Sequence, residues 1–152
     1  MRFFLICILV FPYLLFSKTP CNPKQDALVA AVKERNIPKI EKALKEGALI
    51  NWRDANGWTA LMLAARDGSK EIVQYLIKKG ANVNEKNNVG RTALIFAAAD
   101  GFLEVVKILL AKGADPTAED QRGTTALSIA NMFNQKKVVR IIKKAILDRE
   151  AP

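Results

Sequence analysis

The chain of 152 residues contains no histidine and only two cysteines, Cys7 and Cys21. Without histidine, the protein cannot build an imidazole-based catalytic triad or the histidine ligands of most zinc and copper sites. Two thiols are too few for a four-cysteine zinc site or an iron–sulfur cluster within one chain. The phosphate-binding loop and the Gly-x-Ser-x-Gly motif of hydrolases are also missing. We therefore predict a protein that is not an enzyme, with no catalytic residues, cofactor or metal.

Residues 1–21 differ in composition from the rest of the chain. Arg2 precedes an apolar run over residues 3–16, and Ser17 begins a polar stretch. A helix over this run would be roughly 21 Å long, shorter than the ~30 Å hydrocarbon core of a membrane. A basic start, a short apolar run and small residues are typical of a secretory signal peptide. We predict that residues 1–21 are a signal peptide cleaved between Ser17 and Cys21, and that the protein is periplasmic or secreted.

Two alternatives for this segment place the protein at a membrane. An uncleaved apolar run would tether a structural or scaffold protein through its N-terminus. Cys21 follows the apolar run as the lipidated cysteine of a bacterial lipoprotein does, although Lys18, Thr19 and Pro20 depart from that pattern. A core helix formed by the apolar run is a third reading, which its lack of a polar face disfavours. Membrane contact is expected only through this segment.

The rest of the chain repeats at a fixed interval. Thr-Ala-Leu begins at Thr59, Thr92 and Thr125, each time two residues after a glycine, and Gly-Ala begins at Gly47, Gly80 and Gly113. Both series advance by the same step, and a fixed step of roughly 33 residues is typical of repeat proteins. We therefore predict one repeat domain over 22–152, with repeats at about 24–56, 57–89, 90–122 and 123–147, the first of them degenerate.

Each repeat carries the signals of two helices. Thr59 stands where a short helix would begin, because its hydroxyl can accept a hydrogen bond from a free backbone N–H. Gly68 permits a tight turn. Apolar residues then follow at the spacing of a helix packed on one side, from Ile72 to Ile77. Gly80 ends this second helix, and a polar loop leads to the next repeat.

The segments at 57–65 (GWTALMLAA) and 90–98 (GRTALIFAA) resemble the ankyrin repeat, whose pattern is Gly-x-Thr-Pro-Leu-His-x-Ala-Ala. The resemblance implies an all-α solenoid of about four helix-turn-helix units, eight helices in all, joined by hairpin-like finger loops. Alanine replaces the family's proline, and Met62, Ile95 and Ser128 replace its histidine. Asn131 and Asn134 depart from the pattern in the last repeat, which is expected of a terminal unit.

The resemblance also implies a non-catalytic protein-interaction module that binds its partner through the concave face of fingers and first helices. Trp58 could bind a partner or pack on a neighbouring finger, and Phe133 could bind or fold over the end of the stack. From Trp58→Ala or Arg91→Ala we expect weaker partner capture at a nearly unchanged melting temperature. The predicted partner-binding residues are Trp52, Asn56, Trp58, Arg66, Asp67, Asn88, Val89, Arg91, Asp100, Arg122, Thr124 and Phe133.

The chain is basic, with 24 Lys+Arg against 15 Asp+Glu and a formal charge of +9. The excess lies in the second helices and in the C-terminal cap, whereas charges along the fingers and first helices nearly balance. Nucleic-acid binding requires a basic stripe on one face, so we predict no nucleic-acid partner. Binding of a polyanion by the C-terminal cap is a further alternative. We expect a monomer with one unidentified protein partner.

Overall fold

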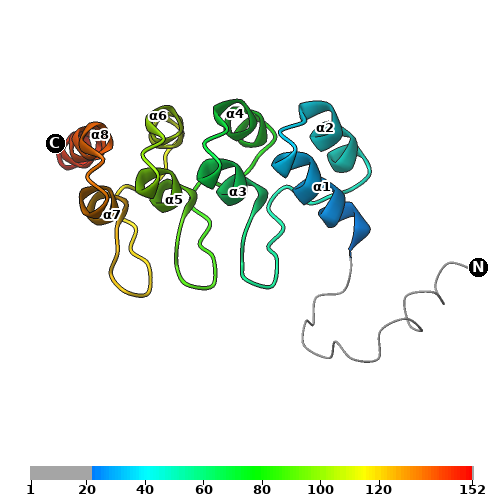
Figure 1. Cartoon of the computed structure of the whole chain (residues 1–152), viewed down its shortest axis with the longest axis horizontal. Coiled ribbons are helices and arrows are strands. Elements are labelled where there is room, and N and C mark those ends of the chain that lie inside the picture. Colours follow the sequence, from blue (N-terminus) through cyan, green and yellow to red (C-terminus); the bar gives the residue numbers. More distant parts are fainter. Residues whose placement is uncertain (1–21, 152) are drawn as a thin grey trace, which may run out of the picture.

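The computed structural model describes residues 22–151, so the predicted signal peptide and Cys21 lie outside the described residues. All regular elements in the described part are helices, which confirms the predicted all-α repeat architecture. The helices form two layers, with odd-numbered helices next to the loops and even-numbered helices behind them (Figure 1). Their bounds are α1 (Pro23–Lys33), α2 (Ile37–Lys45), α3 (Ala60–Arg66), α4 (Lys70–Lys78), α5 (Ala93–Ala99), α6 (Leu103–Ala111), α7 (Ala126–Met132) and α8 (Lys136–Glu150).

Threonine opens the first helix of three successive repeats, as the spacing predicts. The hydroxyl of Thr59 accepts a hydrogen bond from the N–H of Met62, three residues on, at 3.3 Å. Thr92 and Thr125 cap α5 and α7 in the same way. Thr125 and Ser128 complete a reciprocal capping box, in which each side chain accepts from the other residue's N–H. These local bonds explain why the helices begin at the same point of each repeat.

The core runs along the whole stack instead of filling one centre. Leu61 and Leu94 of the inner layer, and Leu76 and Leu109 of the outer layer, are at most 1% exposed. Small residues in α3 and α5, such as Ala65 and Ala98, let successive inner helices approach closely. Each repeat therefore buries its apolar faces on its neighbours, as expected of a solenoid.

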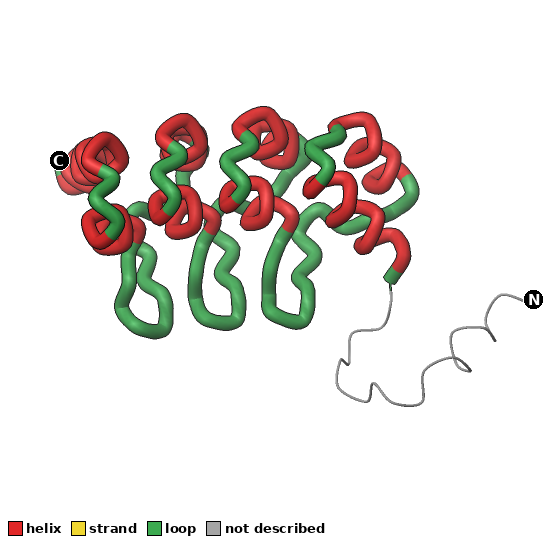
Figure 2. The backbone as a smooth tube through the Cα atoms, in the orientation of Figure 1, coloured by secondary structure: helices red, strands yellow, loops and turns green. Residues whose placement is uncertain are grey.

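Three loops project from the inner layer to the same side of the molecule (Figure 2). Each loop tip is closed by one side chain of a polar residue, Asp54, Asn87 or Asp120. The Oδ1 atom of Asp54 accepts hydrogen bonds from the N–H groups of Asn56 and Trp58, at 2.9 and 2.8 Å. Its own N–H donates to the carbonyl of Trp58 at 3.0 Å. The loops are thus hairpin-like fingers, as predicted, and no strand is formed in the described part of the chain.

Asparagines at the base of the fingers join each repeat to the next. Asn51 donates from Nδ2 to the carbonyl of Gly80 and accepts from the N–H of Asn82. Asn84, at the equivalent position of the following repeat, makes the same bonds to Gly113 and Asp115. Because one amide satisfies both a donor and an acceptor of the neighbouring repeat, it fixes the spacing between successive fingers. No helix between residues 22 and 151 is long and apolar enough to cross a bilayer.

Candidate partner-binding surface

The finger tips and the inner helices form the face on which the predicted binding residues lie (Figure 1). Those with largely exposed side chains are Asn56, Arg66, Asn88, Val89, Asp100, Arg122 and Phe133. Those that are half-buried are Trp52, Trp58, Asp67, Arg91 and Thr124. Asp67 and Asp100 occupy the same position at the end of α3 and α5. Within the described residues, no three acidic or cysteine side chains are grouped so as to hold a metal ion.

Trp52 and Trp58 line one hollow of about 270 Å³ where the first finger meets α1. The α1 helix contributes Asp26, Val29 and Lys33 to its wall. None of these three belongs to the predicted binding set, because the first repeat is degenerate and only the fold places α1 beside the finger. The hollow combines aromatic surface with charges of both signs, which suits a side chain of a partner protein.

Trp58 also packs within the protein. Its ring stacks on Phe96 of the next repeat, with ring centroids 4.4 Å apart and planes inclined by 25°. The guanidinium carbon of Arg66 lies 4.8 Å from the centre of the Trp58 ring. Such stacking and cation–π contacts hold an aromatic ring in place. Trp58 therefore holds two repeats together while its remaining surface borders the hollow.

Arg91 connects the second and third fingers. Its Nε atom lies 3.1 Å from Oδ2 of Asp120, whose side chain is only 2% exposed. Burial by itself would raise the pKa of Asp120, but hydrogen bonds from the N–H groups of Thr124 and Arg122 and from Arg91 outweigh it. Together they lower the pKa of Asp120 from 3.8 to about 2. The side chains of Arg91 and Arg122 border a second hollow of about 290 Å³, beside Val89 and Gln121.

Hydrogen bonds across the finger tips join the three fingers into one surface. The N–H of Asn88 donates to the carbonyl of Asn56 at 3.0 Å, and its Nδ2 donates to the carbonyl of Ala55 at 2.7 Å. Gln121, which the predicted binding set does not contain, repeats both bonds one finger along, to Val89 and Asn88. Part of the predicted binding set therefore orders the surface as well as lining it.

Some predicted binding side chains make no such bonds. Val89 is 49% exposed, and Phe133 at the end of α7 is 55% exposed. The side chain of Arg122 is exposed and forms no ion pair within the described chain. Met132, next to Phe133, is 73% exposed. These residues can contact a partner without first breaking an internal hydrogen bond or ion pair.

The sequence of this chain matches the family model described as "Ankyrin repeats (3 copies)", over residues 9–87, 28–120 and 83–149. The chain belongs to the ankyrin-repeat family. Ankyrin repeats are typically non-catalytic modules for protein–protein interaction, so the predicted class of function holds at that level. The match agrees with the helix pairs and fingers described above.

Two curated relatives match part of this chain. The "Mitochondrial disaggregase" of Bos taurus and that of Homo sapiens are each 44% identical to this chain over 50 residues. The matched segment is 33% of this chain and 7% of each relative. The likeness is therefore confined to a small part of those proteins.

Proposed function

We propose that this ankyrin-repeat protein binds a partner protein through its concave face, without chemistry, and that the hollow at Trp52 and Trp58 is the anchor of the interface. The observation that supports this most directly is the pairing of two tryptophans at one hollow on the finger side of the stack. Tryptophan and arginine are enriched among the residues that carry most of the binding energy of interfaces. Arg66, over the Trp58 ring, adds an arginine beside the hollow.

The neighbouring charges suggest a partner of mixed charge. Asp26 and Lys33 both line the hollow, and the ion pair of Arg91 with Asp120 neutralises the next finger. Charges of both signs lie along the face. Electrostatic interactions would therefore set the register and orientation of the partner, and they would not favour a partner of high net charge.

The test uses exposed residues whose side chains make no hydrogen bond or ion pair within the described chain, so that binding and folding are not confused. Val89→Ser and Arg122→Glu alter the concave face. Leu147→Ser and Lys137→Glu make matched changes on α8, in the outer layer of the stack. We expect the concave pair together to lower capture of the partner from the native compartment by about tenfold or more. The α8 pair should leave capture unchanged, with equal melting temperatures throughout.

Equal capture by all variants, or loss only with the α8 pair, would show that the concave face is not the binding surface. The experiment does not depend on the identity of the partner, because the comparison is between variants of this chain.

Export remains part of the proposal. The apolar run at residues 3–16 supports removal of a signal peptide and a periplasmic or secreted mature protein. Mass spectrometry of the natural N-terminus should give a chain that begins between residues 18 and 22. An intact Met1, or an acyl group on Cys21, would instead support a membrane-tethered protein. Sedimentation of the mature protein should give a monomer.

A further inference from the structure

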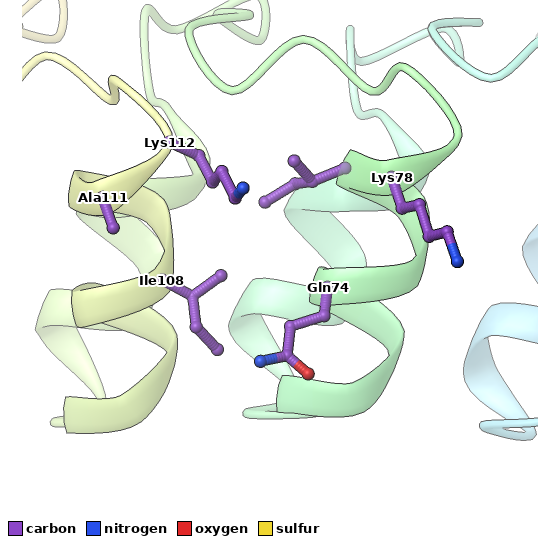
Figure 3. Close-up of a pocket in the computed structure, with 6 residues that line it drawn as sticks. Gln74, Lys78, Ile108, Ala111 and Lys112 are labelled. Atoms are coloured by element: carbon purple, nitrogen blue, oxygen red, sulfur yellow. The ribbon is translucent and has the colours of Figure 1, made fainter.

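A hollow of about 450 Å³ lies on the opposite side from the fingers, between α4 and α6. Ile77 of α4 and Ile108 and Ala111 of α6 provide its apolar lining, and Gln74 borders it. Figure 3 shows Ile108 and Lys112 pointing toward the gap between the two helices, whereas Lys78 points away from it. The lining residues span only about one turn of each helix, so the groove is roughly 6 Å long along the helix axes.

The charges at this groove have one sign. Lys78 and Lys112 line it, and no carboxylate does. Neither lysine forms an ion pair within the described chain. Five other lysines near the outer helices are paired with glutamates, namely Lys39 with Glu34, Lys42 with Glu46, Lys45 with Glu41, Lys70 with Glu71, and Lys107 with Glu104. Lys136 and Lys137 on α8 resemble Lys78 and Lys112 in forming no ion pair within the described chain.

The other end of the same two helices provides a comparison. A hollow there is bordered by Phe102 and Leu103, together with Lys70 and Glu104, so its charges balance. Positive charges at a helix C-terminus interact favourably with the negative end of the helix dipole. This interaction accounts for the lysines at the ends of α4 and α6. The dipole does not account for the half-buried Ile77 and Ile108 and the exposed Ala111 that line the groove between those lysines.

We propose that this convex groove, defined by Gln74, Ile77, Lys78, Ile108, Ala111 and Lys112, binds an acidic amphipathic helix of a partner protein. One bulky aliphatic side chain of that helix would lie between Ile77 and Ile108. A carboxylate one turn away would meet Lys112, which points toward the gap, and the Lys78 side chain would turn toward the groove to meet a second one. Laying the apolar face of a helix into a groove is a common mode of peptide recognition.

The shape of the groove favours a protein segment over a membrane surface. Its apolar lining lies between two helices, so a protruding side chain can reach it while a flat layer of headgroups would touch the lysines at the rim. The groove is also open and bordered by only six residues, whereas small-molecule pockets enclose most of their ligand. This second surface is independent of the concave face.

The experiment uses the full chain and a fluorescein-labelled synthetic helical peptide with leucines at positions i, i+3, i+4 and i+7 and glutamates on both flanks. We expect saturable binding by fluorescence anisotropy and shifts of the Ile77 and Ile108 methyl resonances by NMR. Ile108→Tyr should weaken binding at least tenfold by filling the groove. Tyr75 occupies the equivalent position of the preceding repeat, so tyrosine is compatible with the helix there.

A second variant tests the charges without touching the apolar lining. Lys78→Glu with Lys112→Glu should weaken binding at least tenfold, and the control Lys136→Glu with Lys137→Glu makes the same change in net charge on α8. The control should stay within about twofold of the wild type. A peptide with lysines in place of the glutamates should not bind.

Three results would overturn the proposal. The first is no shift of the two methyl resonances. The second is equal binding of the peptide by wild type and Ile108→Tyr. If both also bound phosphatidylserine vesicles equally, the chain would be responding to negative charge without using the groove. The third is loss of peptide binding in Val89→Ser with Arg122→Glu instead of in the groove variants. The concave variants are tested separately for partner capture. A failure of the groove proposal can therefore be told apart from a failure of the proposed binding through the concave face.

Discussion

In two of the four repeats, a side chain of the next repeat leaves room only for glycine at the turn between the two helices. The closing residue is left-handed in all four repeats, with φ of +53° at Arg35, +66° at Gly68, +74° at Gly101 and +56° at Asn134. A Cβ on Gly68 would lie 2.6 Å from the ring of Phe102 in the next repeat, and one on Gly101 would overlap the Gln135 side chain. No further repeat follows Asn134 within the described residues, so no neighbouring side chain requires glycine there.

We predict that Gly68→Ala lowers the free energy of unfolding by about 2 kcal/mol, because the alanine would have to adopt a left-handed conformation and also displace Phe102. Asn134→Ala is the matched control, because that residue already carries a Cβ and only the backbone preference changes. The control should lose roughly 1 kcal/mol. Urea unfolding measures both, and equal losses would show that crowding by Phe102 is unimportant.

Asp120 should make stability depend on acid pH. Its pKa is about 2 in the folded protein, below the ordinary 3.8. A carboxyl whose pKa is lowered on folding stabilises the protein fully above its unfolded pKa, and that contribution is lost as the pH falls toward the folded pKa. We therefore expect the contribution of Asp120 to disappear between about pH 4 and pH 2.

Asp120→Asn tests this directly, because Asn87 closes the preceding finger with an amide in the same position. The variant keeps an acceptor for the two backbone N–H groups but loses the ion pair with Arg91. Urea midpoints should be lower than those of the wild type at pH 6 and should converge with them near pH 2. A constant difference across this range would contradict the assignment of the low pKa to Asp120.

Some side chains of the fingers and first helices that we propose for partner binding also connect neighbouring parts of the stack. From the sequence, we expected Trp58→Ala and Arg91→Ala to leave the melting temperature nearly unchanged. The structure changes that expectation. Trp58 stacks on Phe96, and Arg91 is the only basic side chain within ion-pair distance of Asp120 in the described chain. Removing one partner of a buried ion pair is destabilising because the other charge is left unpaired.

We predict that Trp58→Ala destabilises the protein by about 2 kcal/mol, because it removes a stacked aromatic pair and part of the packing between repeats. Trp58→Phe, which retains an aromatic ring against Phe96, should recover at least half of that loss. The check is thermal or urea unfolding of both variants. An unchanged unfolding free energy in Trp58→Ala would show that the stack contributes nothing and that the residue is free for binding.

The last repeat differs from the inner repeats at positions that face a neighbouring repeat. Met62 and Ile95 are buried in the inner repeats, whereas Ser128 stands exposed at the equivalent position of the last one. Ala65 and Ala98 are likewise buried, and exposed Asn131 replaces them. The last repeat therefore presents polar groups where an inner repeat would present an apolar face to its neighbour, which is how repeat arrays are capped.

Ser128→Ile with Asn131→Ala should restore the inner-repeat face at the end of the stack. We expect concentration-dependent self-association, because an exposed apolar face without a neighbour is an association surface. Sedimentation velocity over a hundredfold range of concentration would detect it, with Lys136→Ser as a control on the same repeat. A variant that sediments at the wild-type rate at every concentration would show that α8 already covers this face.

The architecture of this protein follows from its sequence alone, because the signals that build one repeat are local. Threonine caps, turn glycines and apolar stripes each act within a single repeat, and their recurrence at a fixed interval requires stacking of equivalent units. Departures from the same repeat pattern predicted the atypical last repeat, and the resemblance to ankyrin repeats predicted the finger loops.

Which surface side chains are free depends instead on the packing between repeats. Trp58 and Asn88 find their partners in an adjacent repeat, and Arg91 finds its partner on the next finger. No local pattern distinguishes an exposed side chain from one that bridges two repeats or two fingers. The hollow beside α1 and the groove between α4 and α6 likewise depend on how far neighbouring helices stand apart. That spacing results from side-chain packing in the folded stack, which the period of the sequence does not specify.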